Sequence, residues 1–202
     1  LAHYANAAAD IEFEFPFGFK EIKGIHSRTD FDLSRHAEFS GKKQQVFDPE
    51  TNQNFTPYVV ETSIGLDRMF LSVLSQSLEE ETLEDGSVRT VLRLPHALAP
   101  TQAAILPLLK KDGLPELARE LYADLKFDFQ VAFDEKDAIG KRYRRQDAIG
   151  TPLCITVDHQ SLEDGTVTLR DRDSMGQKRV HRSELSLIIK EIASMESLLK
   201  KV

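Results

Sequence analysis

The first clear pattern in the chain is an alternation of apolar and polar residues over residues 10–20. Large apolar side chains at every second position would lie on one face of a strand, with carboxylates on the other face. We therefore expect a sheet whose apolar face packs on a core and whose acidic face meets water or a polar cleft. Residues 1–9, rich in alanine, are predicted to be the end of a helix. The apolar positions of the alternation are Ile11, Phe13, Phe15, Phe17 and Phe19.

A second pattern changes its period between residues 58 and 74. Residues 58–63 are rich in β-branched and aromatic side chains, which is typical of a strand. From Leu66 the apolar residues follow the i, i+3, i+4, i+7 spacing of a helix. Gly65 lies at the joint, where we expect a sharp turn that a side chain would obstruct.

This joint between strand and helix is a candidate anion site. The first backbone N–H groups of a helix point beyond its start and favour an anion. Arg68, in the first turn, adds a planar guanidinium suited to phosphate, although a cation there opposes the helix dipole at a cost of roughly 0.3–1 kcal/mol. The alternative is that Arg68 pairs with Asp67 or another surface carboxylate, and spacing alone favours that ion pair.

Beyond residue 74 the pattern predicts short alternating elements. An acidic stretch containing Asp85-Gly86 predicts a hairpin, and the prolines between residues 91 and 100 mark the strongest domain boundary. Helices and apolar strands then alternate, which predicts an α/β sheet covered on both faces. The predicted helices are residues 101–109, a helix from Leu114, residues 137–149 and a long helix from Ser183; the predicted strands are 127–133, 153–157 and 166–170, the last entered through a second turn at Asp164-Gly165.

The helix predicted over residues 137–149 carries a basic cluster in an otherwise acidic chain. One interpretation is a solvated helix face balanced by Asp137 and Asp147, and the composition slightly favours it. The other is contact with the phosphate backbone of RNA. The cluster consists of Lys141, Arg142, Arg144 and Arg145.

Composition narrows the classes of function. A net charge of −7 argues against broad electrostatic binding to nucleic acid or anionic membrane, but not against a local basic site. Cys154 is the only cysteine, so no disulfide can form within the chain. Without a membrane-length apolar run or a signal-peptide pattern, the sequence predicts a cytoplasmic protein. The histidines and aspartates of residues 26–36 match no zinc spacing, so no metal ligands are predicted, and Arg28 is expected to pair with Asp30 or Asp32.

Several of these segments together resemble one family, glycyl-tRNA synthetase, a class II aminoacyl-tRNA synthetase. Residues 10–25 and 28–33 carry the closest resemblance, and residues 61–68 are similar to the third class II signature. Residues 140–147, 149–152 and 170–175 are similar to the anticodon-binding domain of that family. The resemblance covers essentially the whole chain. It implies an α/β protein in which residues 1–91, an α+β catalytic-domain remnant with an antiparallel sheet, precede residues 92–202, an α/β anticodon-binding domain with a mixed sheet.

The resemblance also implies site residues. Arg68 would be the catalytic arginine that holds the triphosphate, and the substrate glycine would bind just before it on the strand. The basic cluster described above would contact tRNA. The glycine-binding residues so implied are Glu61, Thr62, Ser63, Ile64 and Gly65, and the ATP-binding residues are Glu21, Ile22, Gly65, Leu66, Asp67 and Arg68.

The implied activity is that of a glycine–tRNA ligase acting as a homodimer in the cytoplasm. The glycine carboxylate would attack the α-phosphate of ATP in the presence of Mg²⁺, and the glycyl group would pass to tRNA(Gly). Thr62 stands where many relatives have proline. The first and second class II signatures are not in the sequence, so we expect a C-terminal fragment that is inactive alone.

Two rival functions are weighed. One is a non-catalytic synthetase-like binding protein, such as an accessory subunit. The other is a free-standing RNA-binding module, which the roughly ninety residues before the domain boundary disfavour. Retention of Glu61, Ser63 and Arg68 together favours the ligase, because a non-catalytic relative has no chemical reason to keep all three.

Overall fold

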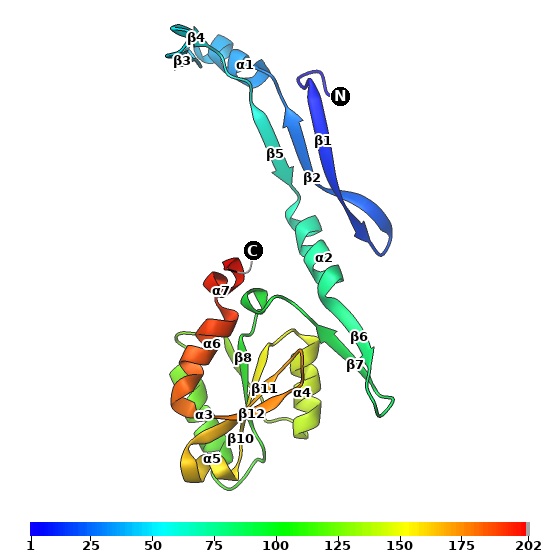
Figure 1. Cartoon of the computed structure of the whole chain (residues 1–202), viewed down its shortest axis with the longest axis vertical. Helices are drawn as coiled ribbons and strands as arrows, with labels where there is room; N and C mark the ends of the chain where they lie inside the picture. Colours follow the sequence, from blue (N-terminus) through cyan, green and yellow to red (C-terminus); the bar gives the residue numbers. More distant parts are fainter. Residues whose placement is uncertain (201–202) are drawn as a thin grey trace. The chain divides into compact units, whose positions relative to one another are not determined.

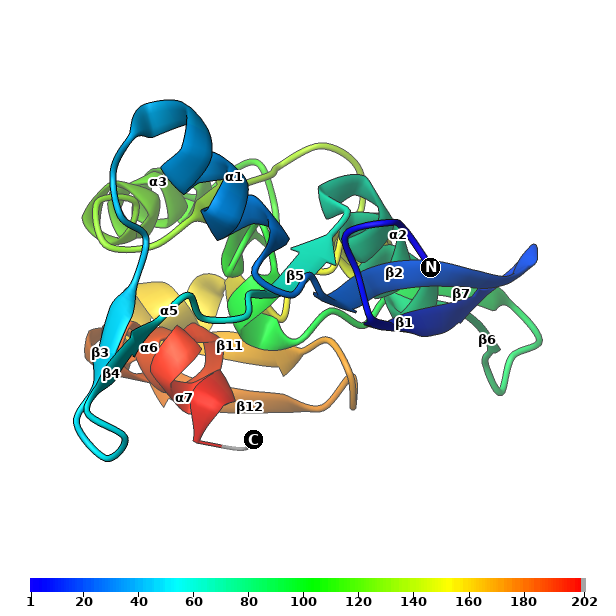
Figure 2. The same ribbon diagram turned by 90° about the horizontal axis from the view of Figure 1, so that it is seen from above.

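The computed structural model describes residues 1–200, which form two compact units divided between Ser75 and Gln76 (Figure 1). The first unit is built on an antiparallel three-stranded sheet of order β1-β2-β5. The strands β1 and β2 lie side by side as a long hairpin (Figure 2). The elements of this part are β1 Ala7–Phe15, β2 Gly18–Ser27, α1 Phe31–Ser40, β3 Val46–Asp48, β4 Gln53–Phe55, β5 Val60–Ile64 and α2 Leu66–Ser77.

The β1–β2 hairpin contains a bulge that decides which side chains share a face. Glu12 pairs with Glu21, and the preceding Ile11 pairs with Lys23, so Ile22 is an extra residue on β2. Because of this extra residue, Glu21 lies on the same face of the sheet as Gly24. In a regular strand, two residues three positions apart would lie on opposite faces. The face that carries Glu21 and Gly24 is called the polar face below.

Two expectations for the start of the chain are wrong. Residues 7–9 are strand rather than helix, because β1 pairs with β2 from Ala7 onward and this pairing overrides the helix propensity of alanine. The alternating apolar residues do not form a core within the described residues: Phe15 is buried, but Ile11, Phe17 and Phe19 are exposed. The alternation is interrupted because the chain reverses between Phe15 and Gly18, which has a φ of +98°.

The second unit is a five-stranded mixed sheet covered on both faces, as the sequence predicts. In the order β12-β11-β10-β8-β9, β8 runs parallel to both β9 and β10, and the remaining pairs are antiparallel. Helices α3 and α6 contribute to the apolar cluster on one face, and α4 packs on the other (Figure 1). Its main elements are β8 Ala103–Pro107, α3 Leu114–Leu125, β9 Val131–Phe133, α4 Ile139–Ala148, β10 Leu153–Val157, α5 His159–Asp164, β11 Thr166–Asp171, β12 Gln177–His181 and α6 Leu185–Ala193.

Four element predictions in this unit are wrong or need new bounds. The strand predicted over residues 127–133 is shorter, β9 Val131–Phe133. The helix predicted over residues 101–109 is the strand β8, because a short, fully buried apolar run has no period that separates strand from helix. Gly165 adopts a left-handed conformation that ends α5, so Asp164-Gly165 is a helix end and not a hairpin. The long C-terminal helix is interrupted at Ser194, which caps α7 Met195–Leu199.

The predicted hairpin at Asp85-Gly86 is confirmed as β6 Leu78–Thr82 and β7 Val88–Leu92. It belongs to the second compact unit, which begins at Gln76. The assignment of residues 1–91 and 92–202 to two domains of the family stays a prediction. Among residues 1–200, no helix is both long enough and apolar enough to cross a membrane.

A buried ion-pair network attaches this hairpin to the mixed sheet. Asp147 of α4 is fully buried and accepts two hydrogen bonds from Arg170, at 2.8 and 3.0 Å. Arg89 of β7 donates from Nε to the same carboxylate at 2.9 Å and also pairs with Glu81. Two buried guanidinium groups are thus neutralised by Asp147 and Glu81.

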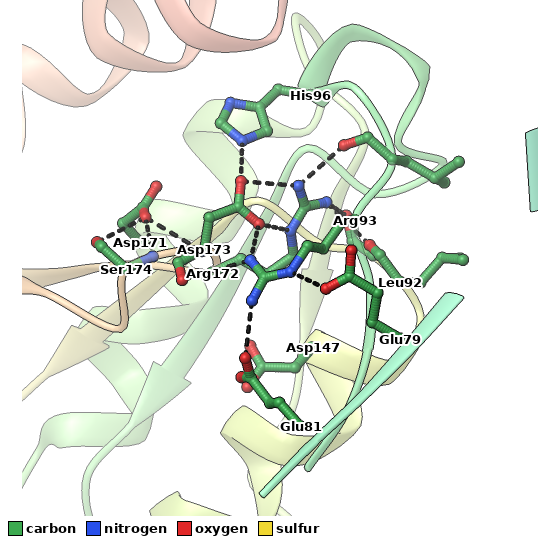
Figure 3. A network of polar contacts seen from close by, with 12 residues as sticks. Glu79, Glu81, Leu92, Arg93, His96, Asp147, Asp171, Arg172, Asp173 and Ser174 are labelled. Carbon is green, nitrogen blue, oxygen red and sulfur yellow. Dashed lines mark hydrogen bonds and ion pairs between the residues drawn. The ribbon is translucent and has the colours of Figure 1, made fainter. Parts of the chain in front are cut away.

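The network continues to the loop after β11 (Figure 3). Arg172 is buried and donates to the backbone carbonyls of Leu92 and Gly150 at 3.0 and 2.9 Å. It also contacts Asp173, which accepts from Arg93 and lies 3.0 Å from His96 Nε2 (Figure 3). The segment that follows the hairpin is therefore fixed to the sheet by guanidinium groups.

We predict that Asp147→Asn destabilises the protein by about 3–5 kcal/mol, because it leaves two buried guanidinium groups without their shared charge. The free energy of unfolding in urea, followed by circular dichroism, measures this change. Asp128→Asn, at an exposed position, is the matched control and is expected to change stability by less than about 0.5 kcal/mol. A loss for Asp147→Asn no larger than that of the control would contradict the role given to the network.

Acid should weaken the same network through Asp173. Burial favours the neutral form of this carboxyl, but hydrogen bonds from His96 and Arg172 outweigh it and hold the pKa well below its ordinary value. A depressed pKa in the folded state contributes stability above the ordinary pKa of about 3.9, and this contribution is lost as the pH falls toward the folded value. The stability difference between the native chain and Asp173→Asn should therefore shrink between about pH 5 and pH 1. A constant difference in urea titrations across that range would show that Asp173 is not the titrating group.

Candidate active site

The predicted glycine-binding residues lie on β5, at its pairing with β2. Glu61 faces His26 and Ser63 faces Gly24 across this antiparallel pair, and opposite residues share a face of the sheet. Glu61 and Ser63 therefore lie on the polar face, and the bulge places Glu21 on the same face. Thr62 and Ile64 occupy the opposite face, where their partners are Ile25 and Lys23.

The predicted ATP-binding segments meet at the start of α2. Arg68 donates from Nη1 to the backbone carbonyl of Glu21 at 2.6 Å, so two segments 47 residues apart in sequence come together. A guanidinium has five N–H donors, and this bond uses one of them. Leu66, Asp67 and Arg68 are exposed, whereas Ile22 is half-buried.

Two glycines near this site differ in how much space surrounds them. A Cβ at Gly24 would lie 2.9 Å from His26 Cε1 and 3.2 Å from Ser63 Oγ, so any side chain there would displace its neighbours. A Cβ at Gly65 would meet only the side chain of Arg68, at 3.7–3.8 Å. The expectation that the chain itself obstructs a side chain at Gly65 is therefore wrong, and Gly24 is the glycine at which a Cβ would crowd neighbouring side chains.

Glu61 forms an ion pair with Arg28 that the sequence does not predict. Arg28 donates from Nη1 to Glu61 Oε2, although 33 residues separate the two. Arg28 also forms the predicted ion pair with Asp32, from Nε at 2.5 Å and from Nη2 at 3.0 Å. These contacts raise the pKa of Arg28, and the hydrogen bond from Arg28 lowers that of Asp32. No local signal predicts the contact with Glu61, because it depends on β2 and β5 being neighbours.

The basic cluster of α4 makes extensive contacts within the second unit. Arg142 is buried and donates to the backbone carbonyls of Pro107, Leu108 and Asp134, while its Nε has no partner in the described part of the chain. Burial lowers the pKa of this guanidinium. Its role in the structure is to join the ends of β8 and β9 to α4.

The other members of the cluster are less buried. Arg144 donates to the carbonyl of Val88 at 2.9 Å, and Arg145 forms ion pairs with Asp134 and Asp137 at 2.7 and 2.9 Å. Lys141 is exposed. Asp137 thus neutralises Arg145, as one interpretation of the cluster expects. Asp147 does not balance the cluster, because it pairs with Arg89 and Arg170. A contact between this cluster and tRNA stays a prediction.

Metal ligands were not predicted from the spacing of histidine and aspartate. Within residues 1–200, no group of three or more His, Cys, Asp or Glu side chains is arranged to hold a metal ion. Cys154 is buried in β10, and burial raises the pKa of its thiol to about 12, so it is a poor nucleophile or ligand at neutral pH.

Comparison with known proteins shows which family and which solved structures this chain is similar to. Residues 102–192 match the family described as "Anticodon binding domain". A crystal structure of the RNA binding domain of threonyl-tRNA synthetase from Cryptosporidium parvum Iowa II aligns with a TM-score of 0.67 and 20% identity. The alignment covers 95% of this chain and 44% of that one, and it shows the fold alone.

Sequence relatives are much more similar. Glycine–tRNA ligase from Bacillus cereus is 57% identical over 185 residues, which are 92% of this chain and 40% of that protein. The ligase from Chlorobaculum tepidum is 54% identical over 91% of this chain and 39% of its own length. The ligase from Treponema denticola is 53% identical over 94% of this chain and 43% of its own length. The chain spans about two-fifths of the length of these curated relatives. The resemblance that the motifs indicate is thereby confirmed, and over about nine-tenths of its length this chain is a homologue of the glycine–tRNA ligases.

Proposed function

We propose that this chain is part of a glycine–tRNA ligase that activates glycine with ATP and transfers the glycyl group to tRNA(Gly) for protein synthesis. One observation carries the proposal: more than half of the residues are identical to ligases over about nine-tenths of the chain. The arrangement of the site supports it. Glu21 contacts Arg68 through its carbonyl and shares the polar face with Glu61 and Ser63.

In the proposed reaction, Glu61 holds the ammonium group of glycine and Ser63 offers a hydroxyl beside it. A carboxylate oxygen of glycine then attacks the α-phosphorus of ATP, and the bond to the β-phosphate oxygen breaks as pyrophosphate leaves. In the second step the terminal ribose hydroxyl of tRNA attacks the glycyl carbonyl, and AMP leaves. Neither step demands a strong acid or base from this chain, so positioning and charge neutralisation supply most of the rate.

Arg68 and the first N–H groups of α2 are proposed to hold the phosphates. The guanidinium is exposed, and the helix start favours an anion. Mg²⁺ would enter with ATP, held mainly by phosphate oxygens, which requires no cage of protein ligands. Specificity for glycine would come from lack of room for a side chain, and the tight packing around Gly24 beside Ser63 supports this idea.

The proposal extends to the complete enzyme. The first and second class II signatures are not among these residues, so we expect the 202-residue chain alone not to form the adenylate. The full-length ligase is proposed to work as a homodimer in the cytoplasm, with residues 92–202 binding tRNA. A non-catalytic accessory protein is the alternative, and absence of glycine-dependent ATP–pyrophosphate exchange by the full-length protein would favour it.

We predict that Arg68→Ala in the full-length ligase lowers the rate of glycine-dependent ATP–pyrophosphate exchange about 10²- to 10³-fold, as loss of a preorganised donor does in other enzymes. Arg35→Ala is the matched control, because Arg35 is exposed on α1 and its ion pair is with Glu38, three residues away on the same helix. Exchange at a near-normal rate after Arg68→Ala would refute its assigned role.

We also predict that Gly24→Ala raises the KM for glycine, because the added Cβ would press on Ser63 and His26 at 2.9–3.2 Å. Displacement of neighbouring groups by one methyl is expected to change KM about tenfold or more. Gly140→Ala is the control, since a Cβ there would meet nothing within 4 Å. Equal KM values for the two variants would show that Gly24 does not shape the glycine site.

A further inference from the structure

Arg28 contacts Glu61 and Tyr4 in addition to its ion pair with Asp32. Its guanidinium makes two bonds to Asp32 and one to Glu61, and its Cζ lies 4.1 Å above the ring of Tyr4. Its backbone N–H donates to the carbonyl of Val59 at 2.9 Å, which extends the pairing of β2 with the segment that enters β5. Arg28 is thus fixed from the backbone outward, and it fixes one oxygen of Glu61.

The charges of these three side chains do not cancel. A single Arg28–Glu61 pair would be neutral, and Glu61 would then attract a cation only weakly. Asp32 forms a two-point pair with Arg28, so the group of Arg28, Asp32 and Glu61 carries one net negative charge. The side chains of Asp32 and Glu61 are 30% and 38% exposed, so the charges are only partly screened by water.

The contacts also leave part of Glu61 available. Arg28 binds Oε2, and within residues 1–200 no hydrogen bond engages Oε1. A carboxylate accepts at both oxygens, so one can be fixed by the protein while the other receives a ligand N–H. This division of the two oxygens suits the ammonium group of an amino acid.

We propose that Arg28 is a positioning residue for Glu61 and that Asp32 neutralises Arg28, so that Glu61 is held in one orientation and still presents a full negative charge to the ammonium group of glycine. The inference rests on the proposed function, since it takes Glu61 as the ammonium partner. It assigns Asp32 a role in binding an ion that Asp32 does not touch. If Asp32 served only to attach α1 to the sheet, its substitution would not affect glycine binding more than ATP binding.

The test is steady-state ATP–pyrophosphate exchange by the full-length ligase with Asp32→Asn. The substitution keeps the shape of the side chain and removes its charge, which leaves Arg28 to neutralise Glu61. We expect the KM for glycine to rise about five- to tenfold, while kcat and the KM for ATP change less than about twofold. Asp30→Asn is the matched control, because Asp30 has the same charge two residues away and bonds Ser34 rather than Arg28.

A second variant separates positioning from folding. Arg28→Lys keeps the charge but cannot reach Asp32 and Glu61 with the same planar fork, so the KM for glycine should rise again. Damage to the sheet would instead raise the KM for ATP too, because Glu21 and Arg68 depend on the same strands. Thermal unfolding midpoints equal to that of the unaltered enzyme would show that the fold is retained.

The outcomes are distinct. A normal KM for glycine in Asp32→Asn, together with a raised value in Glu61→Gln, would overturn this inference and leave the proposed function in place. A normal KM in Glu61→Gln would overturn the role given to Glu61, and the inference with it. Equal increases in the KM for glycine and for ATP in Asp32→Asn would assign Asp32 a structural role only, which also overturns the inference.

Discussion

A guanidinium removed from water has to meet negative charge or carbonyl oxygens, and this constraint shapes both units of the chain. In the second unit, Asp147 lies between Arg89 and Arg170, which come from strands far apart in the sequence. Losing any one partner would leave a buried charge uncompensated, which costs more than the intact pair contributes. The network therefore restricts the unit to one arrangement of hairpin, helix and sheet rather than adding greatly to its stability.

The first unit uses the same constraint close to the proposed site. Arg28 is neutralised by Asp32, and the pair then holds Glu61 without cancelling its charge. The bulge at Ile22 acts beside it, because it places Glu21 on the face that carries Glu61. A regular hairpin would have put Glu21 on the opposite face, away from the residues proposed to bind glycine. One extra residue and one compensated arginine thus organise the polar face.

Local patterns predict the elements well where the residues carry a helical period, a turn signal or a run rich in β-branched side chains. The strand at Leu153–Val157, the hairpin at Asp85-Gly86 and the helix from Leu114 follow from apolar runs and turn residues. The strand β8 is as fully buried and as aperiodic as Leu153–Val157, but its alanine and leucine residues favour a helix, so the local pattern misassigns it. The contact of Arg28 with Glu61 could not be predicted, because it joins two strands whose pairing is a property of the whole sheet. The site residues themselves came from the resemblance, and spacing alone left Arg68 ambiguous.

The contacts of the arginines bear on that ambiguity. Arg145 is paired with Asp134 and Asp137, so its charge is already matched, and Arg142 is buried among backbone carbonyls, so its guanidinium is closed to solvent. Arg68 is different: within residues 1–200 it forms no ion pair, and its hydrogen bond goes to the neutral carbonyl of Glu21. A cation held by a carbonyl at the start of a helix keeps its full charge where the helix dipole already disfavours it. A bound anion would offset this penalty, which supports the phosphate-binding role proposed for Arg68.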